Sequence, residues 1–123
     1  MIRMRLPDDD TLVLLHNPRC SKSRAVHALL TERGVAFTER RYLEDPLSRA
    51  ELASLRERLG RPAAEWVRSG EAAFTAAGLG ASSSEAEILD AMAVHPILIE
   101  RPILARGARA VVGRPPETVL QLL

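Results

Sequence analysis

The chain contains one cysteine, Cys20, and its neighbours suit a reactive thiol. It lies within residues 16–24 (HNPRCSKSR), after a short apolar run and at the start of a helical pattern. The free N–H groups and the macrodipole of a helix N-terminus favour a thiolate. Arg19, Lys22 and Arg24 add positive charge nearby. We therefore expect Cys20 to be a reactive thiolate and not a buried structural cysteine.

Other polar side chains of the same segment could support this thiol. Ser21 and Ser23 are expected mainly as N-cap residues of the helix, and their hydroxyls could also donate to the thiolate. His16 is either a hydrogen-bonded structural histidine, which we favour, or the general base of a Cys–His pair. Asn17 belongs to the polar turn that ends the preceding strand.

The elements that position Cys20 are predicted from apolar periodicity. Residues 12–15 form a continuous apolar run, which is typical of a strand buried on both faces. A helix begins near Ser21 and is closed by Gly34, and residues 35–43 alternate as a second strand. Strand, helix and strand within about 30 residues predict a right-handed parallel unit.

The middle of the chain is predicted to be helical. Capping boxes at Ser48 and Ser84 begin the two longer helices. Helices are expected over residues 48–60, 62–67, 72–77 and 84–95. A β-hairpin follows, with a turn at Gly107, and residues 113–117 begin a last helix.

The predicted order is βαβ, a helical block, then ββα. Without the helical block, this is the element order of an α/β, thioredoxin-like fold with a mixed four-stranded sheet. We therefore expect one domain over residues 1–123, with a helical insertion at about residues 46–96.

Composition excludes several classes of function. The chain has 123 residues, and 17 basic against 16 acidic residues leave a net charge of +1, which does not indicate nucleic-acid binding. Aromatic residues, at 3%, offer no stacking platform for single strands. No apolar run approaches the ~20 residues of a membrane span. Residues 1–10 are interpreted as a solvated lead-in and not a secretory signal.

A lone cysteine in such a chain indicates the cytoplasm, where thiols stay reduced. We expect a monomer that contacts neither nucleic acid nor membrane. His27 and His95 are interpreted as structural, and the sequence indicates no metal site, because no group of His, Cys, Asp and Glu has metal-ligand spacing.

Four segments of the chain resemble the glutaredoxin-linked arsenate reductase family. They are residues 16–24, Tyr42-Leu43-Glu44 ahead of a proline, residues 95–102 (HPILIERP) and residues 113–117 (GRPPE). The segments agree in order and spacing, and the resemblance runs from about Leu12 to the C-terminus.

The resemblance implies an oxidoreductase with a thioredoxin-like domain, a helical insertion and no bound cofactor. Cys20 would attack arsenate to form a thiol–arsenate adduct, and glutathione and glutaredoxin would complete the reduction to arsenite. Arg68, Arg101 and Arg114 match the three arginines of the family's oxyanion site, Arg68 by spacing alone. Arginine suits this task because its fork is always charged and binds two oxygens. Pro102 matches the proline held in cis beside the cysteine.

Having one cysteine limits the redox chemistry. Ser23 stands where dithiol oxidoreductases place the resolving cysteine, so another molecule must resolve any disulfide. Two alternatives stay open: a monothiol, glutaredoxin-like thiol transferase, and a non-catalytic regulator that binds RNA polymerase. Arginines at the site favour an oxyanion over thiol transfer, and the missing Cys-x-x-Cys excludes a switch through an internal disulfide.

Overall fold

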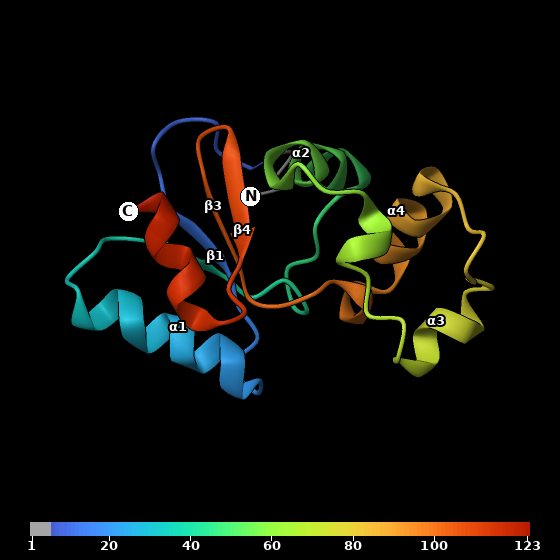
Figure 1. Cartoon of the computed structure of the whole chain (residues 1–123), viewed down its shortest axis with the longest axis horizontal. Helices are drawn as coiled ribbons and strands as arrows, with labels where there is room; N and C mark the ends of the chain where they lie inside the picture. The colour runs from blue at the N-terminus through green and yellow to red at the C-terminus, as the bar shows by residue number, and fades with distance from the viewer. Residues whose placement is uncertain (1–5) are drawn as a thin grey trace.

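The computed structural model describes residues 6–123, which form a four-stranded sheet flanked by helices (Figure 1). The strands are β1 (Val13–Leu15), β2 (Thr38–Arg40), β3 (Ile103–Arg106) and β4 (Arg109–Val112). Their order is β2-β1-β3-β4; β1 and β2 are parallel, whereas β1–β3 and β3–β4 are antiparallel. The predicted α/β class and mixed four-stranded sheet are confirmed.

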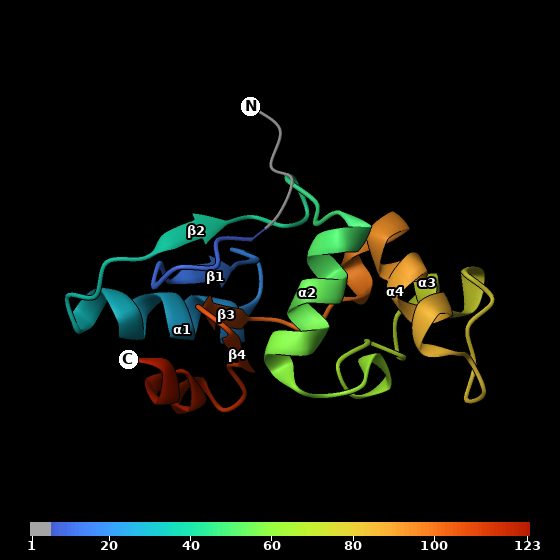
Figure 2. The same cartoon turned by 90° about the horizontal axis from the view of Figure 1, so that it is seen from above.

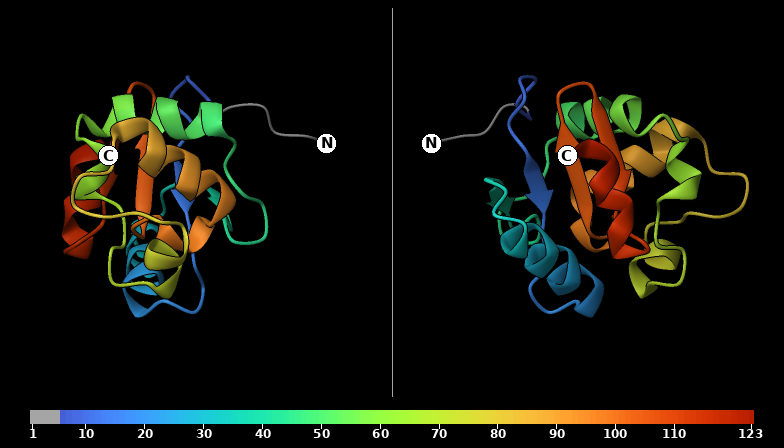
Figure 3. Two further views of the ribbon diagram at one scale, coloured as in Figure 1. Left: turned by 90° about the vertical axis from the view of Figure 1, so that its right-hand side faces the viewer. Right: turned by 60° about the vertical axis from the view of Figure 1, so that its left-hand side comes forward.

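Helices cover both faces of this sheet. The α-helices are α1 (Ser21–Glu32), α2 (Arg49–Leu59), α3 (Ala72–Ala76) and α4 (Glu85–Val94), and the 3₁₀ helices are η1 (Ala63–Glu65), η2 (Pro96–Leu98) and η3 (Pro116–Leu122). α1 and η3 pack together on one face (Figure 3), and the helices between β2 and β3 lie on the other side (Figure 2).

Strand β1 shows why the sheet needs both layers. Leu14 packs in a cluster with α1 and η3, whereas Leu15 joins the larger cluster that includes α2 and α4. Successive side chains of a strand point to opposite faces, so a strand covered on both faces must be apolar throughout. The continuous apolar run that predicted this strand is therefore explained by burial on both sides.

The boundaries of the longer helices follow their capping signals. The hydroxyl of Ser48 accepts the Glu51 N–H, and that of Ser84 accepts the Glu87 N–H, with both boxes closed by the glutamate side chain. Gly60 ends α2 with φ +64°, a left-handed conformation that favours glycine.

The second strand is shorter than predicted. Alternation indicated a strand over residues 35–43, but β2 covers only Thr38–Arg40. β2 lies at the edge of the sheet, and its single neighbour β1 offers three residues for pairing. Strand length is thus set by the partner and not by the local pattern. The final helix also differs in type, because it is 3₁₀ over Pro116–Leu122.

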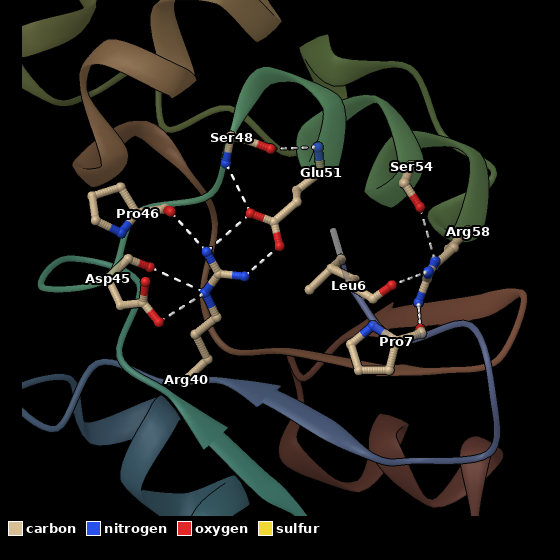
Figure 4. A network of polar contacts seen from close by, with 9 residues as sticks. All are labelled: Leu6, Pro7, Arg40, Asp45, Pro46, Ser48, Glu51, Ser54 and Arg58. Atoms are coloured by element: carbon tan, nitrogen blue, oxygen red, sulfur yellow. Dashed lines mark hydrogen bonds and ion pairs between the residues drawn. The ribbon is translucent and has the colours of Figure 1, made fainter. Parts of the chain in front are cut away.

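The lead-in predicted over residues 1–10 falls partly outside the described residues, which begin at Leu6. Leu6 is 1% exposed and belongs to the larger apolar cluster, so the expectation of a solvated segment is wrong at this residue. Arg58 on α2 donates to the carbonyls of Leu6 and Pro7 and so fixes this end to the helical layer (Figure 4). Within residues 6–123, no helix combines the length and apolarity needed to cross a membrane.

Candidate active site

Cys20 lies between β1 and α1, as the sequence predicted. It is the N-cap residue of α1: its carbonyl accepts the Arg24 N–H at 2.9 Å, and its own N–H donates to the Asn17 carbonyl at 3.0 Å. The thiol is half-buried and makes no capping bond. Arg114 Nη2 lies 3.9 Å from Cys20 Sγ. The sulfur therefore faces both a helix N-terminus and a guanidinium.

Ser23 holds the loop that leads to Cys20. Its Oγ accepts the Asn17 N–H at 3.0 Å and lies 2.7 Å from His16 Nδ1, and all three residues are buried. The predicted N-cap role of Ser21 and Ser23 is wrong, because Cys20 occupies that position and Ser23 bonds the loop instead. Burial lowers the pKa of His16, which favours the neutral imidazole, and its contacts fit the structural role favoured above.

His16 also meets two residues that the sequence did not connect with it. Glu39 Oε1 lies 3.0 Å from His27 Nε2 and 3.9 Å from His16 Nε2. The other carboxylate oxygen accepts from Arg41 Nε at 2.8 Å, a bond that lowers the pKa of Glu39. Within residues 6–123, His16, His27 and Glu39 are the one group of three that could hold a metal ion. Spacing gave no sign of it, because the three come from different elements.

The three predicted arginines meet at one carboxylate, Glu100. Its Oε1 lies 3.3 Å from Arg114 Nε and 3.8 Å from Arg68 Nε, and it accepts the backbone N–H of Arg101 at 3.0 Å. Arg114 Nε also donates to the Arg101 carbonyl at 2.7 Å. Glu100 thus balances part of the positive charge. It had no role in the sequence prediction, since an acid beside an arginine is common on any surface.

Backbone pairing explains how Arg68 reaches this carboxylate. Val67 and Ile99 form an isolated antiparallel bridge, and the Glu100 N–H donates to the Trp66 carbonyl at 3.0 Å. The segment before α3 is thereby held against the segment before β3. Sequence spacing alone had suggested Arg68. It lies 32 residues before Glu100 in the sequence, and this bridge brings the two segments together.

Both arginine–proline bonds of the site, Arg101–Pro102 and Arg114–Pro115, are cis. The first was implied by the resemblance and the second was not expected. Gly113 packs between them: its N–H donates to the Pro102 carbonyl at 2.8 Å. A Cβ at position 113 would lie 2.8 Å from Val26 Cγ2 and 3.0 Å from Pro102 Cγ. Glycine is therefore required for this close approach, which sets the start of the Arg114 segment.

Several buried donors of the cluster have no hydrogen-bond partner. They are Nε and Nη1 of Arg101 and Nη1 of Arg68. The last atom lies 2.6 Å from Glu71 Oε1, so it is paired in charge although the geometry is not that of a hydrogen bond. Glu100 lines two hollows of about 330 and 340 Å³, one with Arg114 and one with Arg68. Buried donors are normally satisfied, so the two unpartnered nitrogen atoms of Arg101 call for an explanation other than packing.

Tyr42 belongs to one of the four segments that carry the resemblance, but the sequence prediction gave it no role in the site. It lies two residues beyond β2, and its side chain is 0% exposed. Burial raises the pKa of its hydroxyl, and the charges of Arg68, Cys20, Glu100 and Arg114 also act on it. One signal could have found it: β1 and β2 are parallel, so residues just beyond β2 lie near those just beyond β1, where the Cys20 loop begins.

Comparisons with known proteins show similarity over nearly the whole chain. The model of the ArsC family matches residues 15–122. An arsenate reductase of Haemophilus influenzae is 38% identical over 115 residues, which cover 92% of this chain and 99% of the relative. The uncharacterized protein YfgD of Escherichia coli (strain K12) is 43% identical over 112 residues, covering 89% and 94%.

A solved structure gives the same result in three dimensions. The arsenate reductase from Vibrio cholerae has a TM-score of 0.87 and 40% identity to this chain, and the match covers 94% of this chain and 99% of that one. The chain therefore belongs to the ArsC family and has the thioredoxin-like fold that its four matching segments implied.

Proposed function

We propose that this chain is an arsenate reductase whose nucleophile is Cys20. One observation carries the proposal: Cys20 Sγ lies at the N-terminal end of α1 and 3.9 Å from Arg114 Nη2, and Arg114 Nε donates to the carbonyl of Arg101, whose side chain has unused donors. A helix N-terminus and a guanidinium stabilise both a thiolate and a tetrahedral anion. The names of the relatives from Haemophilus influenzae and Vibrio cholerae support arsenate as that anion.

The arginines solve an electrostatic problem of this reaction. A thiolate that attacks a multiply charged oxyanion meets repulsion, and fixed positive charge reduces it. Arg114 touches both the sulfur and Glu100, so it bridges the nucleophile and the anion-binding cluster. Arg101 contributes two buried nitrogen atoms that are free to bind arsenate oxygens. Arg68 adds a third positive charge, with its Nε 3.8 Å from the same Glu100 oxygen that Arg114 contacts.

The proposed reaction has two steps: a thiolate first replaces an oxygen on arsenic, and a second thiolate then attacks sulfur. Cys20 Sγ forms a bond to arsenic while one arsenate oxygen takes up protons and leaves as water. The thiolate of glutathione then attacks Cys20 Sγ, and a sulfur–sulfur bond forms. The electron pair of the sulfur–arsenic bond remains on arsenic, so As(V) becomes As(III). Because Cys20 is the one cysteine, glutaredoxin reduces the resulting mixed disulfide.

A coupled assay tests the activity. Purified protein is mixed with arsenate, glutathione, glutaredoxin, glutathione reductase and NADPH, and arsenite is measured directly. We expect arsenite formation that the Cys20→Ser variant lacks entirely. Arsenite at the level of that variant would refute the reductase activity.

The identity of the reductant and the alternative thiol-transferase activity are tested in separate experiments. Replacing glutaredoxin by thioredoxin should abolish turnover, because a thioredoxin does not resolve glutathione mixed disulfides efficiently. A glutathionylated peptide in place of arsenate tests thiol transfer. Reduction of that peptide with no arsenite from arsenate would favour a monothiol transferase over an arsenate reductase.

A further inference from the structure

Tyr42 occupies a position between the surface and the active site. The carbonyl of Arg40, the last residue of β2, accepts the His16 N–H at 2.9 Å, so the chain beyond β2 runs beside the Cys20 loop. Arg41 and Leu43 are exposed and line a hollow of about 240 Å³ against this loop. Tyr42, between them, is 0% exposed and packs in the larger apolar cluster. Its side chain is therefore directed into the protein.

The hydroxyl of this tyrosine has no hydrogen-bond partner within residues 6–123. A buried hydroxyl without a partner destabilises the fold, and a phenylalanine would fill the same space without that penalty. Buried polar groups that remain unsatisfied in a folded protein call for an explanation other than packing. The hydroxyl is thus better explained by a ligand than by the stability of the free protein.

The charges around the hydroxyl belong to the site described above. They are those of Arg68, Cys20, Glu100 and Arg114. The two acceptors among these groups already have partners: Glu100 is bonded by the Arg101 N–H and paired with two arginines, and the sulfur contacts Arg114. An oxyanion entering the cluster would bring the missing acceptor.

We propose that the Tyr42 hydroxyl donates a hydrogen bond to an oxygen of the oxyanion bound at Cys20, as a ligand additional to the arginines. The inference rests on the proposed oxyanion function. The hydroxyl keeps its proton, because burial raises its pKa, and so it acts as a donor and transfers no proton. As a neutral donor it orients the anion without adding to the net charge of the cluster.

The Tyr42→Phe variant separates a binding role from a structural one. Its melting temperature should equal or exceed that of the unsubstituted protein, because an unsatisfied hydroxyl is removed. The arsenate concentration that half-protects Cys20 from iodoacetamide should rise about tenfold to a hundredfold, the worth of a hydrogen bond to a charged group. The alkylation rate without arsenate should not change.

Thr31→Val is the matched control, since it removes an exposed hydroxyl that bonds the His27 carbonyl on α1. It should leave the protection by arsenate unchanged. Equal protection of Tyr42→Phe and the unsubstituted protein would overturn this inference alone, as would a clear loss of melting temperature in Tyr42→Phe. If arsenate fails to protect even the unsubstituted protein and no arsenite forms, the proposed function itself is wrong.

Discussion

Arg40 and Arg101 both withdraw guanidinium nitrogen atoms from water, but they use them differently. Arg40 is 2% exposed and donates to the carbonyls of Asp45 and Pro46 at 3.1 and 2.7 Å. It also forms two bonds to the carboxylate of Glu51, which is wholly buried (Figure 4). In Arg101, by contrast, Nε and Nη1 are buried without a hydrogen-bond partner.

This difference separates an arginine that holds the fold together from one that is available to a ligand. The Arg40 fork joins the end of β2 to the first turn of α2, and its donors are occupied by the protein itself. A buried guanidinium with unused donors is costly, because the lost hydration is not replaced. A bound anion would offset this cost, which is the reason that we propose Arg101 as a ligand of the oxyanion.

The largest effect on stability should come from breaking the Arg40–Glu51 pair. Glu51→Gln leaves the Arg40 charge buried without its counter-ion, and the free energy of unfolding should fall by about 3–5 kcal/mol. Urea denaturation measures this loss, and arsenate turnover per folded molecule should not change. Asp90→Asn is the control, because its pair with Arg49 is exposed, and it should cost less than about 1 kcal/mol. Equal losses in the two variants would show that the buried Arg40–Glu51 pair stabilises the fold no more than the exposed Arg49–Asp90 pair.

Replacing Arg101 should instead lower the activity without lowering the stability. Arg101→Gln removes buried donors that no protein group uses, so the free energy of unfolding should stay the same or rise. The value of kcat/KM for arsenate should fall by about 10²–10³, as for the loss of an anion-stabilising donor. Steady-state kinetics with Arg33→Gln as an exposed, charge-matched control measure the effect. A loss of stability with normal kinetics would show that Arg101 is structural.

Gly113→Ala should lower both stability and activity, because this residue serves both packing and the position of Arg114. The added methyl group would lie 2.8 Å from Val26 Cγ2, and overpacking of this kind costs about 1–3 kcal/mol. We expect lower stability in urea together with lower arsenate turnover per folded molecule. Gly70→Ala, where a Cβ would meet nothing within 4 Å, should be neutral in both measurements. Normal turnover in Gly113→Ala would show that the position of Arg114 does not depend on the packing at residue 113.

The smallest effect concerns pH and the loop before Cys20. Burial lowers the pKa of His16, so below the ordinary value of about 6.5 the unfolded chain binds more protons than the folded one. Stability should therefore decline as the pH falls from 7.5 to 5.5. His16→Asn should flatten this dependence in urea titrations, and an unchanged slope in this variant would show that His16 is not its cause. The Glu39 carboxyl, whose pKa is lowered by Arg41, stays ionised throughout this range.

Local signals in the sequence were enough to predict most elements and the centre of the site. Capping boxes at Ser48 and Ser84 set the helix starts, because a cap is completed within four residues. The turn before Cys20 was predicted for the same reason. Pro102 and the arginines were found through resemblance, which carries information that periodicity does not contain.

What only the tertiary structure decided is which side chains share a partner. The periodicity and charge around Arg40 and Arg101 do not show that Glu51 occupies the donors of the first while two nitrogen atoms of the second have no protein partner. Glu100 and Tyr42 were missed for this reason too. The sequence determined where the thiol would be and which residues are charged. The fold decided which charges are neutralised within the protein and which remain available, because hydrogen-bond partners come from segments that are far apart along the chain.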